Sequence, residues 1–566
     1  MPARETPAQP ADDEARPAHP FPVVGIGASA GGLEALERLT TRLAPSGMAF
    51  VVLQHLAPGH ESVLTDILAR GSTLKVVTIE NGMKVEPNTI FVAPPNVELA
   101  LYEGALRVSQ PAEKRFPRHS IDAFFRSIAS EARASAVGVI LSGSGSDGTL
   151  GLKAIKEEGG ITFVQDPSTA GQPSMPQSAL DAGYADFCLS PAEIGEELAR
   201  LGTHPYVARA APRPFDEESR VKLMLLLRSA FGIDFGSYKR TTVDRRIQRR
   251  LAVHKLERLE DYLTLVATQP RELSVLCSEL LIGVTRFFRD AEPFEALKTE
   301  ALPQLLEDRP SVAPLRVWVA GCSTGEEAYS IAICLVEHLT AASMHHRIQI
   351  FATDVDEQAL VVARQGLYPQ SIELDVSPER LRLFFTRTDK GYQVKRSVRD
   401  LVVFARHNLG KDPPFSRLDL LSCRNVLIYM QPALQRKVLR VFHYALQPSG
   451  FLLLGSSESV GEDSDLFALV DRKMRLYQRK ARAPVPVFDF ATSGPPRPGS
   501  RCKGPAPPRS TCSASRTAAC STSTPRRGSS STRASASSSS AGARAATSSR
   551  PPASRPSSCR GSRARS

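Results

Sequence analysis

The segment VVGIGASAGGLEAL places a serine in a glycine-rich turn between an apolar run and a helical pattern. Gly27, Ser29 and Gly31 match the pattern G-x-S-x-G, in which a sharp strand-to-helix turn exposes a nucleophilic hydroxyl. Gly25, Gly27 and Ala30 also satisfy the loose dinucleotide-binding pattern. Either motif alone is weak, so residues farther along the chain must decide between a nucleophile and a nucleotide site.

Two later residues favour the nucleophile. A dinucleotide site needs an acidic residue about twenty positions on, but the next apolar run, MAFVVLQHL, ends in Gln54 and His55. A histidine at that sheet edge suits a general base, and Asp147, in the loop of VGVILSGSGSDGTLGL, would lie at the same edge to orient it. The pattern predicts a hydrolase triad of Ser29, His55 and Asp147, in a chain order that differs from ordinary α/β-hydrolases.

A second glycine turn lies in LRVWVAGCSTGEEAYSIAI. Gly321 and Gly325 would let the backbone approach a ligand at a helix N-terminus. Glu326 and Glu327 make a phosphate a poor occupant and favour the cationic groups of S-adenosylmethionine. Asp354 ends the next strand, where a ribose diol is usually held. These residues favour a nucleotide-like cofactor over a purely structural turn.

The elements that must position the first set of residues lie in 21–200. Short β-rich runs alternate there with helical patterns such as Gly32–Leu43 and Leu150–Glu158, which predicts a doubly wound α/β sheet. The expected strands are Val23–Gly27, Ala49–Gln54, Thr89–Ala93, Gly138–Ser142 and Ile161–Gln165. Residues 201–215 contain three prolines and are expected to form a linker.

Residues 216–283 are predicted to form a small all-α domain. Val243, Ile247 and Leu251 fall four apart on one helix face. The other faces of this helix carry four arginines, Arg245, Arg246, Arg249 and Arg250. These are either a solvated surface or a docking face for an acidic partner helix.

Residues 284–480 are predicted to form a second α/β domain. Its expected strands are Leu315–Ala320, Ile348–Thr353, Leu418–Ser422 and Phe451–Gly455. The whole chain is therefore expected to be an α/β multidomain protein with disordered ends at 1–20 and 481–566.

The net charge of +12 lies in the C-terminal tail. Residues 491–566 hold 13 Arg, one Lys and no acidic residue, so the first 490 residues carry about −2, the difference between +12 and +14. The tail has no aliphatic Val, Ile or Leu, no Met and no aromatic residue, which predicts a disordered C-terminal tail. Its composition resembles a GC-rich gene read out of frame after about Phe490. The rival interpretation is a nucleic-acid-binding tail, but no aromatic residue is present to stack on bases.

The cysteine spacing and the apolar runs indicate the cellular location of the protein. Five cysteines outside the tail are scattered without metal-ligand spacing, so we expect no metal and no disulfide framework. The first twenty residues lack the apolar core of a signal peptide, and no run approaches the length of a membrane span. We expect a cytoplasmic protein without membrane insertion and without a specific nucleic-acid partner.

Several segments together resemble the catalytic domain of the chemotaxis protein-glutamate methylesterases (CheB). They are GASAGG, QHL, GMKVEPNTIFVAPPN, SGSGSDGTLGL and QDPSTAGQPSMPQSAL. The resemblance implies Ser29 as nucleophile, His55 as base and Asp147 as the orienting carboxylate, with backbone N–H groups near Ala30 and Ser144 as the oxyanion hole. This family usually has Met at the position of Ser144 and begins with a phosphorylation-controlled receiver domain. None precedes the serine motif here, so we expect no activation by phosphorylation in cis.

The region from 216 onward resembles the chemotaxis receptor methyltransferases (CheR). The resemblance rests on TRFFRD, VWVAGCSTGEEAYSIA, ATDVDEQAL, ARQGLY, FARHNLG and LDLLSCRNVLIYM. It implies a Rossmann-like, S-adenosylmethionine-dependent domain whose cofactor site is lined by Thr285, Arg289, Glu326, Asp354, Asn408, Leu409, Arg424 and Asn425. Arg289 and Tyr429 would lie near the reacting methyl group and the acceptor carboxylate. The family often has Asn at the position of Gly283, and its β-subdomain after Tyr368 is expected to be short here.

These features lead to the hypothesis of a bifunctional enzyme. It would methylate glutamates of chemoreceptors or similar acidic helical signalling proteins and hydrolyse the esters, with glutamine deamidation as a related hydrolysis. The basic helix would then meet the acidic methylation helices. A non-catalytic scaffold is the alternative of a different class. An NAD-linked enzyme is disfavoured by His55, which stands where an acidic residue is needed.

Overall fold

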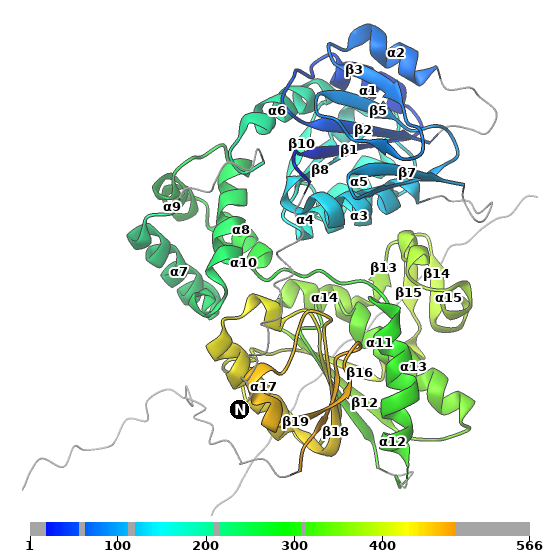
Figure 1. Cartoon of the computed structure of the whole chain (residues 1–566), viewed down its shortest axis with the longest axis vertical. Coiled ribbons are helices and arrows are strands. Elements are labelled where there is room, and N and C mark those ends of the chain that lie inside the picture. Colours follow the sequence, from blue (N-terminus) through cyan, green and yellow to red (C-terminus); the bar gives the residue numbers. More distant parts are fainter. Residues whose placement is uncertain are drawn as a thin grey trace, which may run out of the picture. The chain divides into compact units, whose positions relative to one another are not determined.

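The computed structural model describes residues 19–55, 63–110, 119–207, 214–307, 309–310 and 313–481, all within one structural unit, Met1–Thr492 (Figure 1). The predicted disordered ends lie outside the described residues except at 19–20 and 481, and so does the centre of the predicted linker, 208–213. Among the described helices, none is both long and apolar enough to cross a membrane.

The first α/β region is built on a parallel sheet of seven strands, in the order β10-β9-β8-β1-β2-β5-β3. The strands are β1 (Val23–Ala28), β2 (Ala49–Gln54), β3 (Lys75–Thr78), β5 (Thr89–Val92), β8 (Ala136–Ile140), β9 (Ile161–Gln165) and β10 (Phe187–Leu189). Every residue of β1, β8 and β9 is buried, as expected for strands covered on both faces. The doubly wound sheet and its five predicted strands are confirmed.

Two sets of helices cover this sheet. One face packs against α1 (Gly32–Thr40), α2 (Leu64–Gly71) and α6 (Pro191–Thr203), and the other against α3 (Ser120–Ala132), α4 (Thr149–Glu157) and α5 (Ser174–Asp181). A small antiparallel sheet of β4 (Met83–Lys84), β6 (Glu98–Tyr102) and β7 (Ala105–Ser109) lies beside α3. Helix α6 continues three residues into the predicted linker because Leu201 is buried in the core.

The all-α domain contains α7 (Glu217–Phe231), α8 (Arg240–Val253), α9 (Leu259–Thr268) and α10 (Pro270–Leu280), with Leu227, Ile247 and Tyr262 in its core. The expectation that the arginines of α8 form a solvated or partner-binding surface is wrong for three of the four. Arg246, Arg249 and Arg250 are buried, because α8 packs against acidic and carbonyl groups on several sides.

The second sheet has the order β16-β12-β11-β17-β18-β20-β19. Its first five strands are parallel: β11 (Leu315–Ala320), β12 (Ile348–Asp354), β16 (Val402–Arg406), β17 (Leu418–Cys423) and β18 (Leu446–Leu454). β19 (Phe467–Asp471) and β20 (Leu476–Arg479) extend it in the antiparallel sense. This sheet confirms the predicted second α/β domain.

Helices again lie on both faces of this sheet. α11 (Ala291–Ala296), α12 (Leu302–Leu306), α13 (Glu326–Ala341) and α14 (Glu357–Gln365) share one core cluster, and α17 (Pro432–Ala445) lies in the other. The predicted short subdomain consists of α15 (Pro378–Phe384), α16 (Arg396–Arg399) and the antiparallel strands β13 (Leu367–Tyr368), β14 (Phe385–Thr388) and β15 (Gly391–Val394).

Trp318 lies at the centre of the second sheet, fully buried in β11. Its indole Nε1 donates a hydrogen bond to Thr353 Oγ1 at 2.9 Å, across to β12. Because it is the only tryptophan in the chain, its fluorescence reports on this domain alone.

Replacement of Thr353 by Val should leave the buried indole N–H unpaired and destabilise the second domain by about 1–3 kcal/mol. Urea unfolding followed by tryptophan fluorescence measures this loss. Thr264→Val, at an exposed position of α9, is the matched control. Equal unfolding midpoints for both variants would show that the indole bond contributes nothing.

Candidate active sites

Ser29 lies in the turn between β1 and α1, at the carboxyl end of the first sheet. Its backbone N–H donates to the carbonyl of Ser142 at 2.9 Å, and its own carbonyl accepts from Gly32 at 2.9 Å. Gly31 has a φ of +72° and a Cβ there would lie 2.9 Å from Ser142 Oγ, so the tight turn requires glycine. The turn leaves Ser29 partly exposed beside the loop that follows β8.

His55 and Asp147 meet at the same edge of the sheet. His55 follows β2, and its Nε2 lies 3.1 Å from Asp147 Oδ2 and 2.8 Å from Ser120 Oγ. The buried Asp147 carboxylate accepts backbone N–H groups from Ile121 at 3.1 Å and Gly148 at 2.9 Å. A third N–H, from Asp122, completes its support. The geometry therefore unites the predicted base with its orienting carboxylate. Within the described ranges, no hydrogen bond joins Ser29 to His55.

The predicted cofactor loop lies between β11 and α13. Gly321 and Gly325 have φ values of 75° and 95°, and a Cβ at Gly321 would lie 2.4 Å from Val426. Asp354 accepts the backbone N–H of Ser323 at 2.8 Å, which ties the loop to the end of β12. Burial raises the pKa of Asp354.

A cavity of about 470 Å³ opens in front of this loop. Its size falls in the range of small-molecule sites. Seven of the eight predicted cofactor residues line it: Thr285, Arg289, Asp354, Asn408, Leu409, Arg424 and Asn425. Tyr429, predicted to lie near the reacting methyl group, lines it as well.

Glu326, the eighth predicted cofactor residue, lines a neighbouring cavity of about 1150 Å³ instead. Six residues line both cavities, so the two spaces meet there: Ile282, Val284, Thr285, Arg289, Asn425 and Tyr429. This junction is where a cofactor in the smaller cavity would face an acceptor in the larger one.

Comparison with known families matches three parts of the chain. Residues 24–198 match the CheB methylesterase family, 221–281 the all-alpha domain of CheR methyltransferases, and 283–476 the SAM-binding domain of CheR methyltransferases. The putative methyltransferase Cher3 of Pseudomonas putida is 36% identical over 47% of this chain and 98% of its own length. The chain belongs to the CheB methylesterase and CheR methyltransferase families.

Other relatives cover different shares of the chain. An uncharacterized 104.1 kDa protein of Rhodobacter capsulatus is 36% identical over 462 residues, and the alignment spans 76% of this chain but 48% of that protein. A chemotaxis protein methyltransferase of Borreliella burgdorferi is 30% identical over 44% of this chain and 90% of its own length. The Thermotoga maritima CheB methylesterase catalytic domain is 31% identical over 32% of this chain and 98% of its own, with a TM-score of 0.31.

S-adenosylmethionine is the cofactor of the CheR domain. The charged groups that line the smaller cavity fit this cofactor, which carries a carboxylate, an ammonium and a sulfonium group. Arg424 has buried Nε and Nη1 atoms without a hydrogen-bond partner, as expected where a ligand carboxylate binds. Glu327 and Asp354 line the same cavity and offer carboxylates to cationic and hydroxyl groups.

Two supports of the CheR site leave no motif in the sequence. Glu458 accepts the backbone N–H groups of Asn425 at 2.9 Å and Leu427 at 2.7 Å, and so fixes the loop that carries Asn425. The all-α domain supplies Tyr238, which lines the cofactor cavity and pairs with Met430 in an isolated bridge. The contacts span 30 or more residues of sequence, so local patterns could not reveal them.

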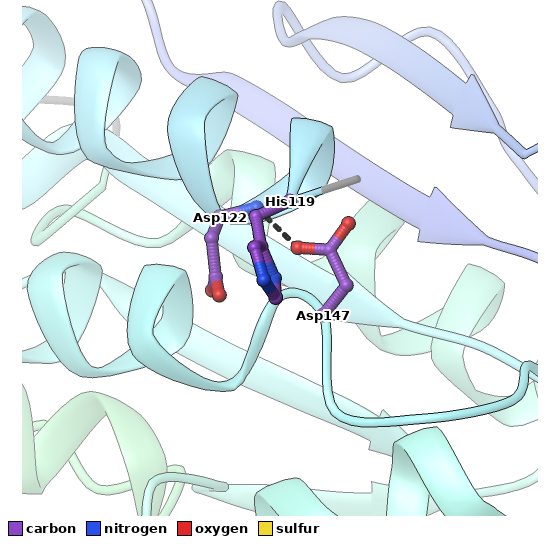
Figure 2. A group of neighbouring side chains, drawn as sticks. All are labelled: His119, Asp122 and Asp147. Atoms are coloured by element: carbon purple, nitrogen blue, oxygen red, sulfur yellow. Dashed lines mark hydrogen bonds between the residues drawn. The ribbon is translucent and has the colours of Figure 1, made fainter. Parts of the chain in front are cut away.

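A cluster of titratable side chains surrounds Asp147 of the CheB site (Figure 2). His119, Asp122 and Asp147 each offer an atom that could bind a metal ion, and these atoms lie within 4.8 Å of one another. Both ring nitrogens of His119 and Asp122 Oδ2 are buried without a hydrogen-bond partner. Burial, followed by the charge of Asp147, raises the pKa of Asp122 to about 8, and burial lowers the pKa of His119. Both groups are therefore neutral near pH 7, and Asp147 already accepts three backbone N–H groups, which leaves it little capacity for a cation.

Replacement of Asp122 by Asn should stabilise the protein relative to wild type as the pH rises from about 4 to 8. The raised pKa of Asp122 means that the folded wild-type protein favours the protonated carboxyl group. The contribution of Asp122 to wild-type stability is therefore present at low pH and is lost as the pH approaches 8. Asn keeps the oxygen that accepts Gly151 N–H. Urea unfolding at several pH values measures the effect, with Asp66→Asn on the exposed face of α2 as control. A stability difference that is independent of pH would contradict the assignment.

Proposed function

We propose that this chain adds methyl groups to glutamate side chains of chemoreceptors or similar acidic helical signalling proteins, and hydrolyses the resulting esters. The observation that carries the proposal is the presence of two separate candidate residue sets in one chain. One lies at the carboxyl edge of the first sheet and the other lines the cavities of the second. The reactions belong in the cytoplasm, where receptor methylation helices are accessible.

In the esterase site, Ser29 Oγ attacks the ester carbonyl while His55 accepts its proton. Asp147 stabilises the imidazolium that forms. The proton then passes to the departing methoxide, which leaves as methanol. Water hydrolyses the acyl-enzyme by the same route. Backbone N–H groups near Ala30 and Ser144 would receive the oxyanion. His55 must bring a ring nitrogen within hydrogen-bond reach of Ser29, a contact that often tightens only with substrate bound. Glutamine deamidation would use the same steps with ammonia as the leaving group.

In the transferase site, bound S-adenosylmethionine supplies an electrophilic methyl group. The acceptor glutamate is already a competent nucleophile, so the chain's residues orient it and exclude water. Arg289 lies at the junction of the two cavities, where its guanidinium can pair with the acceptor carboxylate. Burial raises the pKa of Tyr429 to about 12, so its hydroxyl stays protonated and can donate a hydrogen bond to the same carboxylate.

A non-catalytic scaffold would need neither set of groups. The buried Nε of Arg424, which has no hydrogen-bond partner, favours a cofactor-binding site, because an unsatisfied buried donor costs stability when no ligand uses it.

Ser29→Ala and Tyr429→Phe should separate the two activities. With labelled S-adenosylmethionine and receptor fragments from the host, Ser29→Ala should lose at least about 10³-fold in methanol release yet still incorporate label. Tyr429→Phe should slow incorporation by roughly tenfold or more and leave hydrolysis of pre-methylated fragments unchanged. Ser109→Ala, exposed on β7, is the control. Wild-type rates in both variants would support the scaffold.

A further inference from the structure

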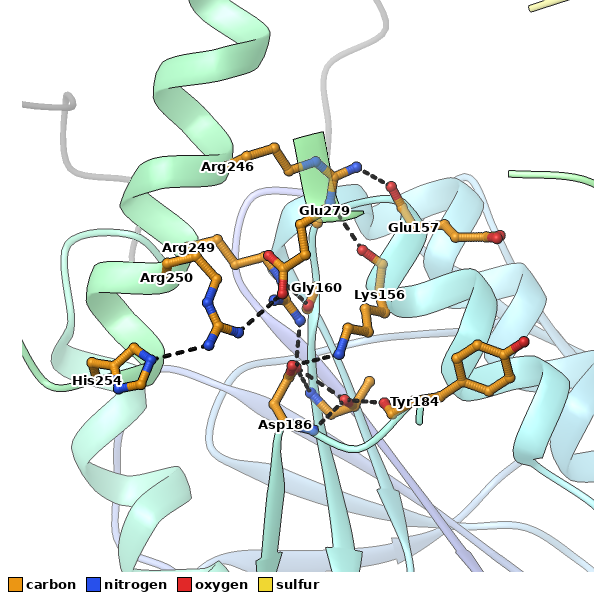
Figure 3. Close-up of polar contacts among 12 residues, drawn as sticks. Lys156, Glu157, Gly160, Tyr184, Asp186, Arg246, Arg249, Arg250, His254 and Glu279 are labelled. Carbon is orange, nitrogen blue, oxygen red and sulfur yellow. Dashed lines mark hydrogen bonds and ion pairs between the residues drawn. The ribbon is translucent and has the colours of Figure 1, made fainter. Parts of the chain in front are cut away.

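Helix α8 of the CheR all-α domain is bound by the CheB domain of the same chain (Figure 3). Arg246 donates to the carbonyls of Lys156, at 3.0 Å, and Glu157. Arg245 donates to the carbonyl of Glu158 at 2.6 Å. These carbonyls end α4, where the last turn of a helix lacks internal partners and carries partial negative charge. The arginines therefore cap α4.

Arg249 adds a buried ion-pair network to this interface. It is fully buried and donates to the carbonyl of Gly160 at 2.9 Å, to Glu279 of α10 at 2.7 Å and to Asp186 beside β10. Ala252 belongs to the apolar cluster of the first sheet, so the contact is also hydrophobic. A buried, fully paired guanidinium indicates a specific docked arrangement rather than a chance approach.

A lysine on α4 reaches Glu326, a candidate cofactor residue of the other domain. Lys153 Nζ lies 3.4 Å from Glu326 Oε1 and 3.5 Å from Thr324 Oγ1, and both charged groups are buried. On the neighbouring helix α3, Arg126 forms a bidentate pair with Asp375, at 2.8 and 3.1 Å. The CheB domain thus contacts the CheR domain on the acceptor side of its site.

The larger cavity lies between these surfaces. Lys153, Glu157 and Arg126 line it from the CheB domain, and Arg289 and Tyr429 line it from the CheR domain. An incoming acceptor helix is about 10 Å across and must fit beside α4 to reach the junction with the cofactor cavity. An acidic acceptor would also meet the Glu158 carboxylate at the end of α4, whose charge adds to burial in raising the pKa of Tyr429.

We propose that α4 closes the acceptor side of the methyltransferase site, so that the docked chain is a transferase-closed state held by Lys153 on Glu326 and by Arg126 on Asp375. This inference rests on the proposed function. Acidic acceptors enter after the CheB domain moves away from the cavity. An acceptor that enters the larger cavity must displace Lys153 from Glu326, so acceptor binding and closure oppose each other, and each weakens the other by the same factor.

The arrangement also links the two active sites physically. α4 begins directly after Asp147 and Gly148 and ends at Glu157, a length of about 13 Å for a helix of this size. One end belongs to the esterase loop and the other to the wall of the acceptor cavity. Opening the transferase site therefore moves the helix that follows the esterase carboxylate.

A charge-swap series in the full chain tests the closure. Arg126→Asp and Asp375→Arg should each raise the rate of label incorporation into receptor fragments by roughly fivefold or more, and the double swap should restore the wild-type rate. Lys153→Met should raise the rate of label incorporation by a similar factor and leave methanol release unchanged. Lys75→Met, an exposed lysine of the CheB domain, is the control.

Hydrogen exchange at residues 153–160 provides a readout that needs no catalysis. The single charge reversals should speed exchange there, and the double swap should slow it again. Equal exchange and equal incorporation in the singles and the double would overturn the closure. If exchange follows the predicted pattern while no variant incorporates label, the proposed methyl transfer fails and the closure stands.

Discussion

Arg249 lies in α8 with no exposed surface, and its guanidinium bonds at once to Gly160, Glu279 and Asp186. Transfer of such a charge out of water is costly, and removal of one partner of a buried pair typically costs about 3–5 kcal/mol. The interaction therefore fixes where α8 can sit on the first sheet. Because the all-α domain also pairs with the segment around Tyr429, it sets where the two candidate sites face each other.

The consequence for function lies in α4. This helix receives the esterase loop at its N-terminus and presents Lys153 and Glu157 to the transferase cavity. Two opposing reactions in one chain would waste cofactor if both sites worked on the same acceptor at once. A helix that is shared by both domains can separate the two reactions in time. When α4 closes the acceptor cavity, methyl transfer stops, and when it moves away, transfer can proceed.

Much of this molecule follows from local sequence patterns. The apolar runs before Ser29, His55 and Asp147 predicted the strands that bring these residues to one sheet edge, because parallel strands end together. Local patterns also predicted the glycine turn before α13 and the position of Asp354 at the end of β12. Family resemblance supplied the remaining cofactor residues, and seven of the eight line one cavity.

The rest depended on contacts between distant residues. Charge pattern alone could not distinguish a solvated arginine from one buried against helix carbonyls, so α8 was misjudged. Lys153 and Glu326 are 173 residues apart in the sequence. Glu458 lies 30 or more residues after the loop around Asn425 that it supports. His119 and Asp122 carry no motif, and the short strands β3 and β10 lack a clear period, which is why none of these was predicted.

The most direct test of the central claim is a pulse–chase with the purified full chain, labelled S-adenosylmethionine and receptor fragments from the host. Label should first enter glutamate side chains. After excess S-adenosylhomocysteine stops transfer, the same label should leave as methanol. Label that never enters any fragment, or that enters and stays, would contradict a chain that both makes and hydrolyses these esters.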